Sequence, residues 1–203
     1  MQKILLQIII SISILLSSYY TLNAEEKNHK IVKLVNNNVI TNYDLEQRLK
    51  LYSTLNNVNI NKGNIDKLAD EMLSFMVDEK LQLEQINSYE ISINESEVNN
   101  YIEQAYLSDS NNLNEFISVL DNNNIDIEIL KKSIEIMIGW NKLTSNLYYR
   151  TSEINKVDLE NLMNEDISLS EEQAENILLQ KQIGLRAKKL LRDIRIEANI
   201  ENR

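Results

Sequence analysis

Few side chains in this sequence could do acid–base or nucleophilic chemistry. There is no cysteine, which excludes a disulfide, a thiolate metal site and a cysteine nucleophile. The single histidine, His29, excludes a zinc site built from several histidines, and we expect it to be solvated. Three glycines without a Gly-Lys-Ser or Gly-Lys-Thr triplet leave no loop to cradle a nucleotide phosphate. Adjacent carboxylates such as Asp78 and Glu79 point to different sides of a helix and indicate surface charge. We therefore predict no catalytic residue, no metal site and no cofactor.

Binding is the chemistry that the remaining side chains favour. Nine tyrosines, five methionines and one tryptophan can build an adaptable apolar surface. A phenol tolerates half-burial, so the tyrosines are better surface candidates than the tryptophan. The stripe of Trp140, Leu143 and Leu147 is expected to pack against the last helix, and contact with a partner is the alternative. The candidate binding residues are Tyr101, Tyr106, Trp140, Leu143, Tyr148 and Tyr149.

The charge of the chain argues against a general nucleic-acid binder. The 203 residues hold 21 basic and 31 acidic side chains, for a net charge of −10, whereas phosphate contacts need clustered cations. Residues 181–203 differ, with seven basic and three acidic side chains, hence +4, while residues 25–180 carry −15. We expect the basic face of this last helix to be solvated or to rest on the acidic body. Binding to lipid headgroups or to an acidic partner is the alternative.

The first 24 residues are typical of a secretory signal peptide. Lys3 supplies a positive start, residues 4–16 form an apolar run, and Ala24 offers a cleavage site. The run is shorter than the roughly 20 apolar residues that a membrane-spanning helix needs. We therefore predict a signal over residues 1–24 and a mature chain from Glu25, with an uncleaved anchor as the alternative.

The apolar pattern of the remaining chain predicts a mainly α fold with one small strand element. Two β-branched runs separated by three asparagines (36–38) predict a tight hairpin, because asparagine tolerates positive φ. Thr41 to Asp44 then reads as a helix N-cap with a carboxylate three residues later. Further helices are expected over 65–86, from a cap at Asn94, over 113–120, over 126–149, from a cap at Asn155 and over 171–196. Residues 198–201 are a candidate strand that pairs with the hairpin.

The predicted helix over residues 126–149 carries apolar stripes on two nearly opposite faces. One face includes Leu130 and Ile134, and the other includes Ile136, Trp140 and Leu143. A helix that is apolar on two faces is either covered on both sides or leaves one face for a partner.

The order of these segments resembles the SurA family of periplasmic chaperones. Residues 31–49 resemble the opening hairpin and first helix of that family, and residues 76–98 resemble its central helix followed by a capped helix. Residues 125–143 are similar to its long helix, and residues 185–201 to its closing helix and strand. The likeness covers nearly all of residues 31–203, and the order of the segments behind a predicted signal carries it.

The resemblance implies a compact helical chaperone core over residues 25–203, with a β-hairpin joined by a C-terminal strand. Residues 25–165 would form an N-terminal helical region, and residues 170–203 a helix and strand that pack back on it. Members of the family usually carry one or two parvulin prolyl-isomerase domains before the last helix. Only residues 165–169 lie in that gap here, so we expect a core without isomerase domains and without enzyme activity.

By this resemblance, the chain is expected to be an ATP-independent periplasmic holdase. Its clients would be unfolded outer-membrane proteins or other secreted polypeptides, bound through the aromatic candidates above. No nucleic acid is expected as a partner, and no stable membrane span after cleavage of the signal. The alternative is a non-catalytic adaptor or scaffold for one folded partner in the cell envelope. An uncleaved segment over residues 4–22 would then anchor it to the inner membrane, facing the periplasm.

Overall fold

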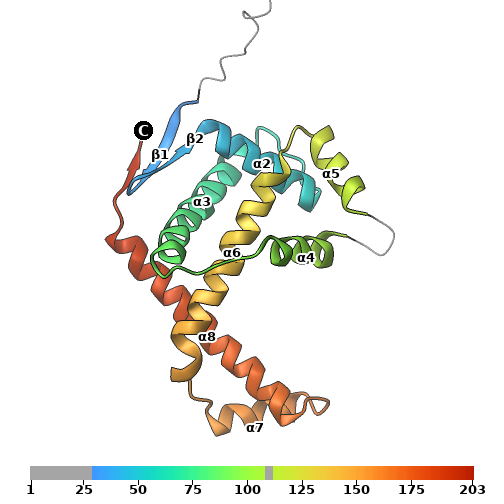
Figure 1. Cartoon of the computed structure of the whole chain (residues 1–203), viewed down its shortest axis with the longest axis vertical. Helices are drawn as coiled ribbons and strands as arrows, with labels where there is room; N and C mark the ends of the chain where they lie inside the picture. The colour runs from blue at the N-terminus through green and yellow to red at the C-terminus, as the bar shows by residue number, and fades with distance from the viewer. Residues whose placement is uncertain (1–28, 108–111) are drawn as a thin grey trace, which may run out of the picture. The chain divides into compact units, whose positions relative to one another are not determined.

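Helices make up most of the structure, and a small sheet lies at one end of them (Figure 1). The computed structural model describes residues 29–107 and 112–203, so the predicted signal over residues 1–24 lies outside it. The helices are α2 (Asn42–Asn56), α3 (Ile65–Ser88), α4 (Glu95–Tyr106), α5 (Leu113–Asn122), α6 (Ile127–Tyr148), the short 3-10 helix η1 (Tyr149–Thr151), α7 (Lys156–Glu165) and α8 (Glu171–Glu197). The strands are β1 (Ile31–Val35), β2 (Asn38–Thr41) and β3 (Ile200–Asn202). The predicted mainly α fold is confirmed.

The sheet joins the two ends of the described chain. Its order is β2-β1-β3, and both pairings are antiparallel. Asn36 has a φ of 50° in the hairpin turn, and its backbone N–H donates to the Asn199 carbonyl at 2.8 Å. Asn38, which we expected in the turn, instead pairs with Val35 as the first residue of β2. The predicted C-terminal strand is confirmed, and it ties residues 200–202 to the hairpin.

α3 lies at the centre of the helical body. Met76, Val77 and Leu81 of this helix pack with Val35 and Ile40 of the sheet in one buried cluster. The helix continues past the predicted end and joins two further neighbours, α6 and α8. The prediction of a central helix that begins at residue 65 is therefore confirmed.

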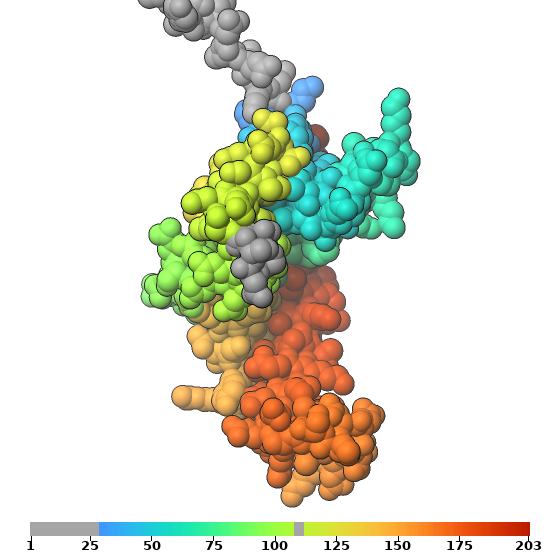
Figure 2. Space-filling view, turned by 90° about the vertical axis from the view of Figure 1, so that its right-hand side faces the viewer, coloured from blue at the N-terminus to red at the C-terminus, as the bar shows by residue number. Residues whose placement is uncertain are grey.

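α6 is covered on both of its apolar faces. Leu130 and Ile134 pack in a cluster with residues of α2, α4 and α5. On the other face, Trp140 and Leu143 pack in a second cluster with Ala187 of α8. Figure 2 shows α2 (cyan), α4 (green) and α5 (yellow-green) gathered above α7 and the first half of α8 (orange). Of the two alternatives that the sequence left open for this helix, the structure shows coverage on both sides.

α8 packs on the body along its second half and on α7 along its first half. Ile183 and Ala187 are buried against the body, and Ala174 and Leu179 are buried nearer the start of the helix. In Figure 1, α7 and the first half of α8 lie side by side. α7 ends and α8 begins with only five residues between them, as the sequence predicted. Among the described helices, none is long and apolar enough to cross a membrane.

A side chain at position 139 would crowd two isoleucines where α6 packs on α3. A Cβ there would lie 2.9 Å from Cδ1 of Ile86 and 3.0 Å from Cδ1 of Ile93. Alanine is the better helix former by about 1 kcal/mol, but overpacking costs about 1–3 kcal/mol. We expect Gly139→Ala to lower the free energy of unfolding by about 1 kcal/mol net, measured by urea denaturation followed by circular dichroism.

Gly184→Ala is the matched control. A Cβ at this position of α8 meets no atom within 4 Å. Alanine should therefore stabilise the chain by about 0.5–1 kcal/mol through helix propensity alone. If both variants gained stability, the tight contact between α3 and α6 would not exist in solution.

Candidate functional site

One ion pair ties three helices together in the middle of the body. Arg48 of α2 donates from Nη2 to Oε2 of Glu79 on α3 at 2.6 Å, and from Nη1 to Oε1 at 3.0 Å. Ser133 of α6 donates to the same Oε1 at 3.0 Å and accepts a hydrogen bond from Arg48 Nη1. The two charged side chains are only 17% and 21% exposed. Such a two-pronged contact is among the strongest that proteins make between charged groups.

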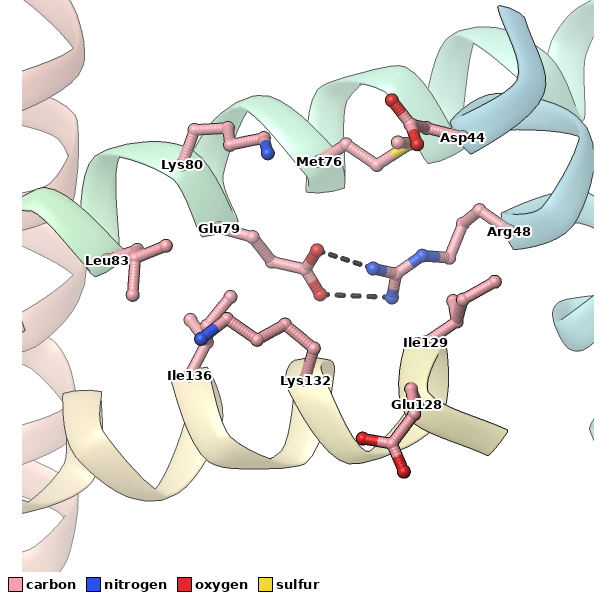
Figure 3. Close-up of a pocket in the computed structure, with 10 residues that line it drawn as sticks. All are labelled: Asp44, Arg48, Met76, Glu79, Lys80, Leu83, Glu128, Ile129, Lys132 and Ile136. Carbon is pink, nitrogen blue, oxygen red and sulfur yellow. Dashed lines mark hydrogen bonds and ion pairs between the residues drawn. The ribbon is translucent and has the colours of Figure 1, made fainter. Parts of the chain in front are cut away.

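The charged pocket lies on one side of this ion pair. Figure 3 shows Arg48 and Glu79 pointing toward each other from α2 and α3, with side chains of α6 beneath them. The cavity has a volume of about 290 Å³. Besides the ion pair, its lining contains four charged residues and four apolar residues. They are Asp44, Lys80, Glu128 and Lys132, and Met76, Leu83, Ile129 and Ile136. Charges of both signs thus surround an apolar lining.

The tyrosine pocket lies on the other side of the same ion pair, between α2, α4 and α6. It also has a volume of about 290 Å³, and Arg48 and Glu79 line it as well. Its remaining lining contains three tyrosines, five aliphatic or thioether side chains and two small polar ones. They are Tyr52, Tyr101 and Tyr106; Leu51, Leu55, Leu130, Ile134 and Met137; and Asn56 and Ser133. The two pockets therefore adjoin and share this part-buried ion pair in their linings.

Tyr106 is a partly buried aromatic group of the tyrosine pocket. Its ring stacks on Phe116 of α5, with centroids 5.7 Å apart and planes 17° apart. Burial raises the pKa of the Tyr106 phenol, and the nearby Tyr101 raises it further. The phenol therefore stays protonated at neutral pH and can donate a hydrogen bond, for example to a peptide carbonyl.

The start of α4 is fixed on α6, and this fixes the two tyrosines that α4 carries. The carboxylate of Glu97 accepts a hydrogen bond from the backbone N–H of Asn94 at 2.9 Å. Lys142 of α6 reaches the same carboxylate oxygen at 2.7 Å and the Ser92 carbonyl at 3.0 Å. Because the predicted cap at Asn94 is confirmed, α4 begins where the sequence placed it.

The structure distributes the six predicted binding residues over three places. Tyr101 and Tyr106 come together in the tyrosine pocket. Trp140 and Leu143 are only 8% and 1% exposed and pack toward α8, so they are not part of either pocket. At the end of α6, Tyr148 lies 5.7 Å below the guanidinium of Arg186, and the following residue, Tyr149, is 58% exposed.

Sequence reasoning missed the ion pair and the third tyrosine of the pocket. Tyr52 is not among the predicted binding residues, although it lines the tyrosine pocket. Glu79 was treated as surface charge, and Arg48 was not singled out. Nothing in one sequence indicates that residues 31 positions apart form a pair. The pairing becomes visible only in the structure, where both side chains are largely covered by apolar neighbours.

A family model of SurA-like N-terminal domains matches residues 1–144. The match covers more than half of the chain. The chain belongs to this family. The resemblance inferred from the order of the segments is thereby confirmed, and the comparison reports no parvulin domain. No curated protein matches the chain.

The SurA-like match contains both pockets. Every residue that lines them lies between Asp44 and Met137, within the matched range. The family is of chaperone type and generally periplasmic. α7, α8 and β3 lie beyond the match, although β3 completes the sheet that begins in it.

Removing both ends of the ion pair should destabilise the chain by less than the sum of the two single changes. Arg48→Met alone leaves Glu79 nearly buried without its partner, and Glu79→Leu does the same to Arg48. Because both groups keep some water contact, we expect each single change to lower the free energy of unfolding by about 2 kcal/mol. The double variant should cost at least about 1 kcal/mol less than the sum, measured by urea denaturation.

The exposed pair Lys67–Glu71 is the matched control for this double-mutant cycle. Its nitrogen and oxygen lie 3.7 Å apart, and the lysine side chain is 82% exposed. Its cycle should show no measurable coupling, since solvent screens such pairs. Additive costs at Arg48 and Glu79 would contradict a coupled pair between the pockets.

The contact that fixes α4 should give stability a pH dependence. The hydrogen bond from Asn94, followed by that from Lys142, holds the pKa of Glu97 below its ordinary value of 4.5. A lowered folded-state pKa means that the stabilisation is fully present above pH 4.5 and is lost as pH falls through the lower folded value. We expect the free energy of unfolding of the Glu97→Gln variant to depend less on pH between these two limits than that of the unchanged protein. If urea denaturation showed that the free energy of unfolding falls equally with decreasing pH in both proteins, Glu97 would not stabilise the start of α4 in this way.

Proposed function

We propose that the chain is an ATP-independent periplasmic holdase for unfolded outer-membrane proteins. The observation that carries this proposal is the pair of adjoining pockets, one lined by tyrosines and one rimmed by charge, inside the SurA-like domain. The predicted signal over residues 1–24 supports export. We further propose that the chain binds clients without prolyl isomerase activity.

The lining of the two pockets suits many client sequences. An apolar or aromatic client side chain can enter the tyrosine pocket, where a phenol can donate to the client backbone. The charged pocket offers Lys80 to acidic client groups. Its Lys132 and Glu128 are held in ion pairs with Glu135 and Lys131 on the surface of α6, which client charges could exchange. Strands of outer-membrane barrels alternate apolar and polar residues and carry aromatic girdles. A site with both kinds of lining tolerates such segments without reading one sequence.

Binding of this kind can be reversible without nucleotide. A dissociation constant near micromolar corresponds to about −8 kcal/mol. Burial of roughly 500 Å² of apolar surface contributes on the order of 12 kcal/mol. Ordering of the disordered client costs several kcal/mol of that gain. The balance favours a complex that forms at cellular concentrations and dissociates again.

The direct test follows the light scattering of a urea-denatured outer-membrane β-barrel protein diluted without ATP. The chain as isolated from cells should suppress aggregation at near-equimolar ratio, and an unrelated acidic helical protein should not. Tyr101→Ser should weaken client binding about fivefold, the loss expected for one aromatic contact. Tyr101→Phe should retain most of it. Tyr89→Ser is the matched control, because Tyr89 is 53% exposed and lines neither pocket.

Two results would contradict the holdase proposal. The first is light scattering equal to that of the acidic control protein, which would mean that the chain does not hold unfolded clients. The family fold would then favour an adaptor that binds one folded partner. A pull-down would test that alternative. Equal loss in the Tyr101 and Tyr89 variants, with unchanged urea midpoints, would place client binding outside the tyrosine pocket. Tyr149→Ser in the same assay tests the remaining sequence prediction at the end of α6.

A further inference from the structure

One face of α8 is basic and is not used by the proposed client site. Residues 176–192 contain five basic side chains and no carboxylate, in a chain with a net charge of −10. Lys181, Lys188 and Lys189 are exposed and form no ion pair with any described residue. Arg192 is 65% exposed and contacts its neighbour Asp193 at 3.0 Å. The three lysines are therefore available to a partner, while Arg192 shares its charge with Asp193.

Large aliphatic side chains lie among these cations. Ile177, Leu185 and Ile196 are 45%, 60% and 75% exposed. Steps of three and four residues place them on the same helical face as the cations. We call this face the α8 basic stripe; it consists of Ile177, Lys181, Leu185, Lys188, Lys189, Arg192 and Ile196. At 1.5 Å per residue it extends for about 30 Å.

Other basic residues of α8 serve the fold and so differ from the stripe. Arg186 donates to the side chain of Thr151 at 2.8 Å and to its carbonyl at 3.0 Å. Arg195 is bonded to Asp78 of α3. Ile183, on the other side of the helix, is only 4% exposed. Cations bonded to the body thus have partners there. Lys181 and Leu185 of the stripe line a cavity with Asp158 and Glu165 of α7, and Lys188 lines one with Trp140 of α6, but all three side chains stay exposed.

We propose that the α8 basic stripe binds the anionic surface of a phospholipid bilayer. A helix face that mixes lysine or arginine with exposed leucine and isoleucine suits the membrane interface, where cations meet headgroups and aliphatic groups enter the acyl boundary. This binding does not require client binding by the tyrosine pocket.

Cosedimentation with vesicles tests the proposal. The protein as isolated from cells, its N terminus determined by mass spectrometry, is mixed with vesicles of equal parts phosphatidylglycerol and phosphatidylcholine, or of phosphatidylcholine alone. It should prefer the anionic vesicles and lose that preference at high salt. Each cation near such a surface strengthens binding about fivefold. Lys181→Gln/Lys188→Gln/Lys189→Gln should therefore weaken binding on the order of a hundredfold.

The matched control removes the same charge elsewhere. Lys62→Gln/Lys67→Gln/Lys156→Gln also replaces three exposed lysines, and it should keep nearly full binding. The N-terminal residues are the same in all variants, so their own membrane affinity cancels. Leu185→Ser/Ile196→Ser should weaken binding less than the lysine changes do.

Three outcomes would overturn the proposal. One is equal affinity for both kinds of vesicle, and another is equal loss in the two triple variants. The third is a wild-type oligomer that the stripe variant lacks, because a second copy would then cover the stripe.

Discussion

Coverage of α6 on two opposite faces determines how the rest of the molecule is arranged. One face packs with α2, α4 and α5 through Leu130 and Ile134, and the other holds α8 through Trp140 and Leu143. α3 approaches the same helix at residue 139, a glycine, where a Cβ would crowd Ile86. Since α6 is central to both groups, the pockets and the C-terminal helix share one support. A displacement of α6 would move both.

The buried ion pair explains why two pockets remain between these helices. Apolar side chains at Arg48 and Glu79 would pack together and fill the space, whereas a guanidinium and a carboxylate need polar neighbours and keep their own geometry. Ser133 supplies one such neighbour, but Arg48 Nε is buried without a hydrogen-bond partner among the described residues. The pair therefore stabilises less than ideal packing would. In return, it keeps an apolar pocket and a charged pocket side by side.

Local signals predicted the elements well, because capping and periodicity act over a few residues. Thr41, Asn94 and Ser170 each cap a helix where the sequence indicated. The two-faced pattern of residues 126–149 predicted coverage of α6 but did not decide between the protein's own helices and a partner. The sites depend on contacts between distant residues. The pairing of Arg48 with Glu79 and the convergence of Tyr52 with Tyr101 arise only once α2 lies across α3 and α6.

The uneven charge of the chain connects its two proposed surfaces. Residues 25–180 carry −15 and include every residue that lines the two pockets, while residues 181–203 carry +4. Near an anionic surface the first group is repelled and the second attracted, so the chain would be oriented as well as bound. The buried face of α8 packs toward α6, and no residue of the basic stripe lines the charged pocket or the tyrosine pocket. An oriented chain would thus keep its client site open to the solution, where unfolded polypeptides diffuse. Neither surface would have to release its partner for the other to bind.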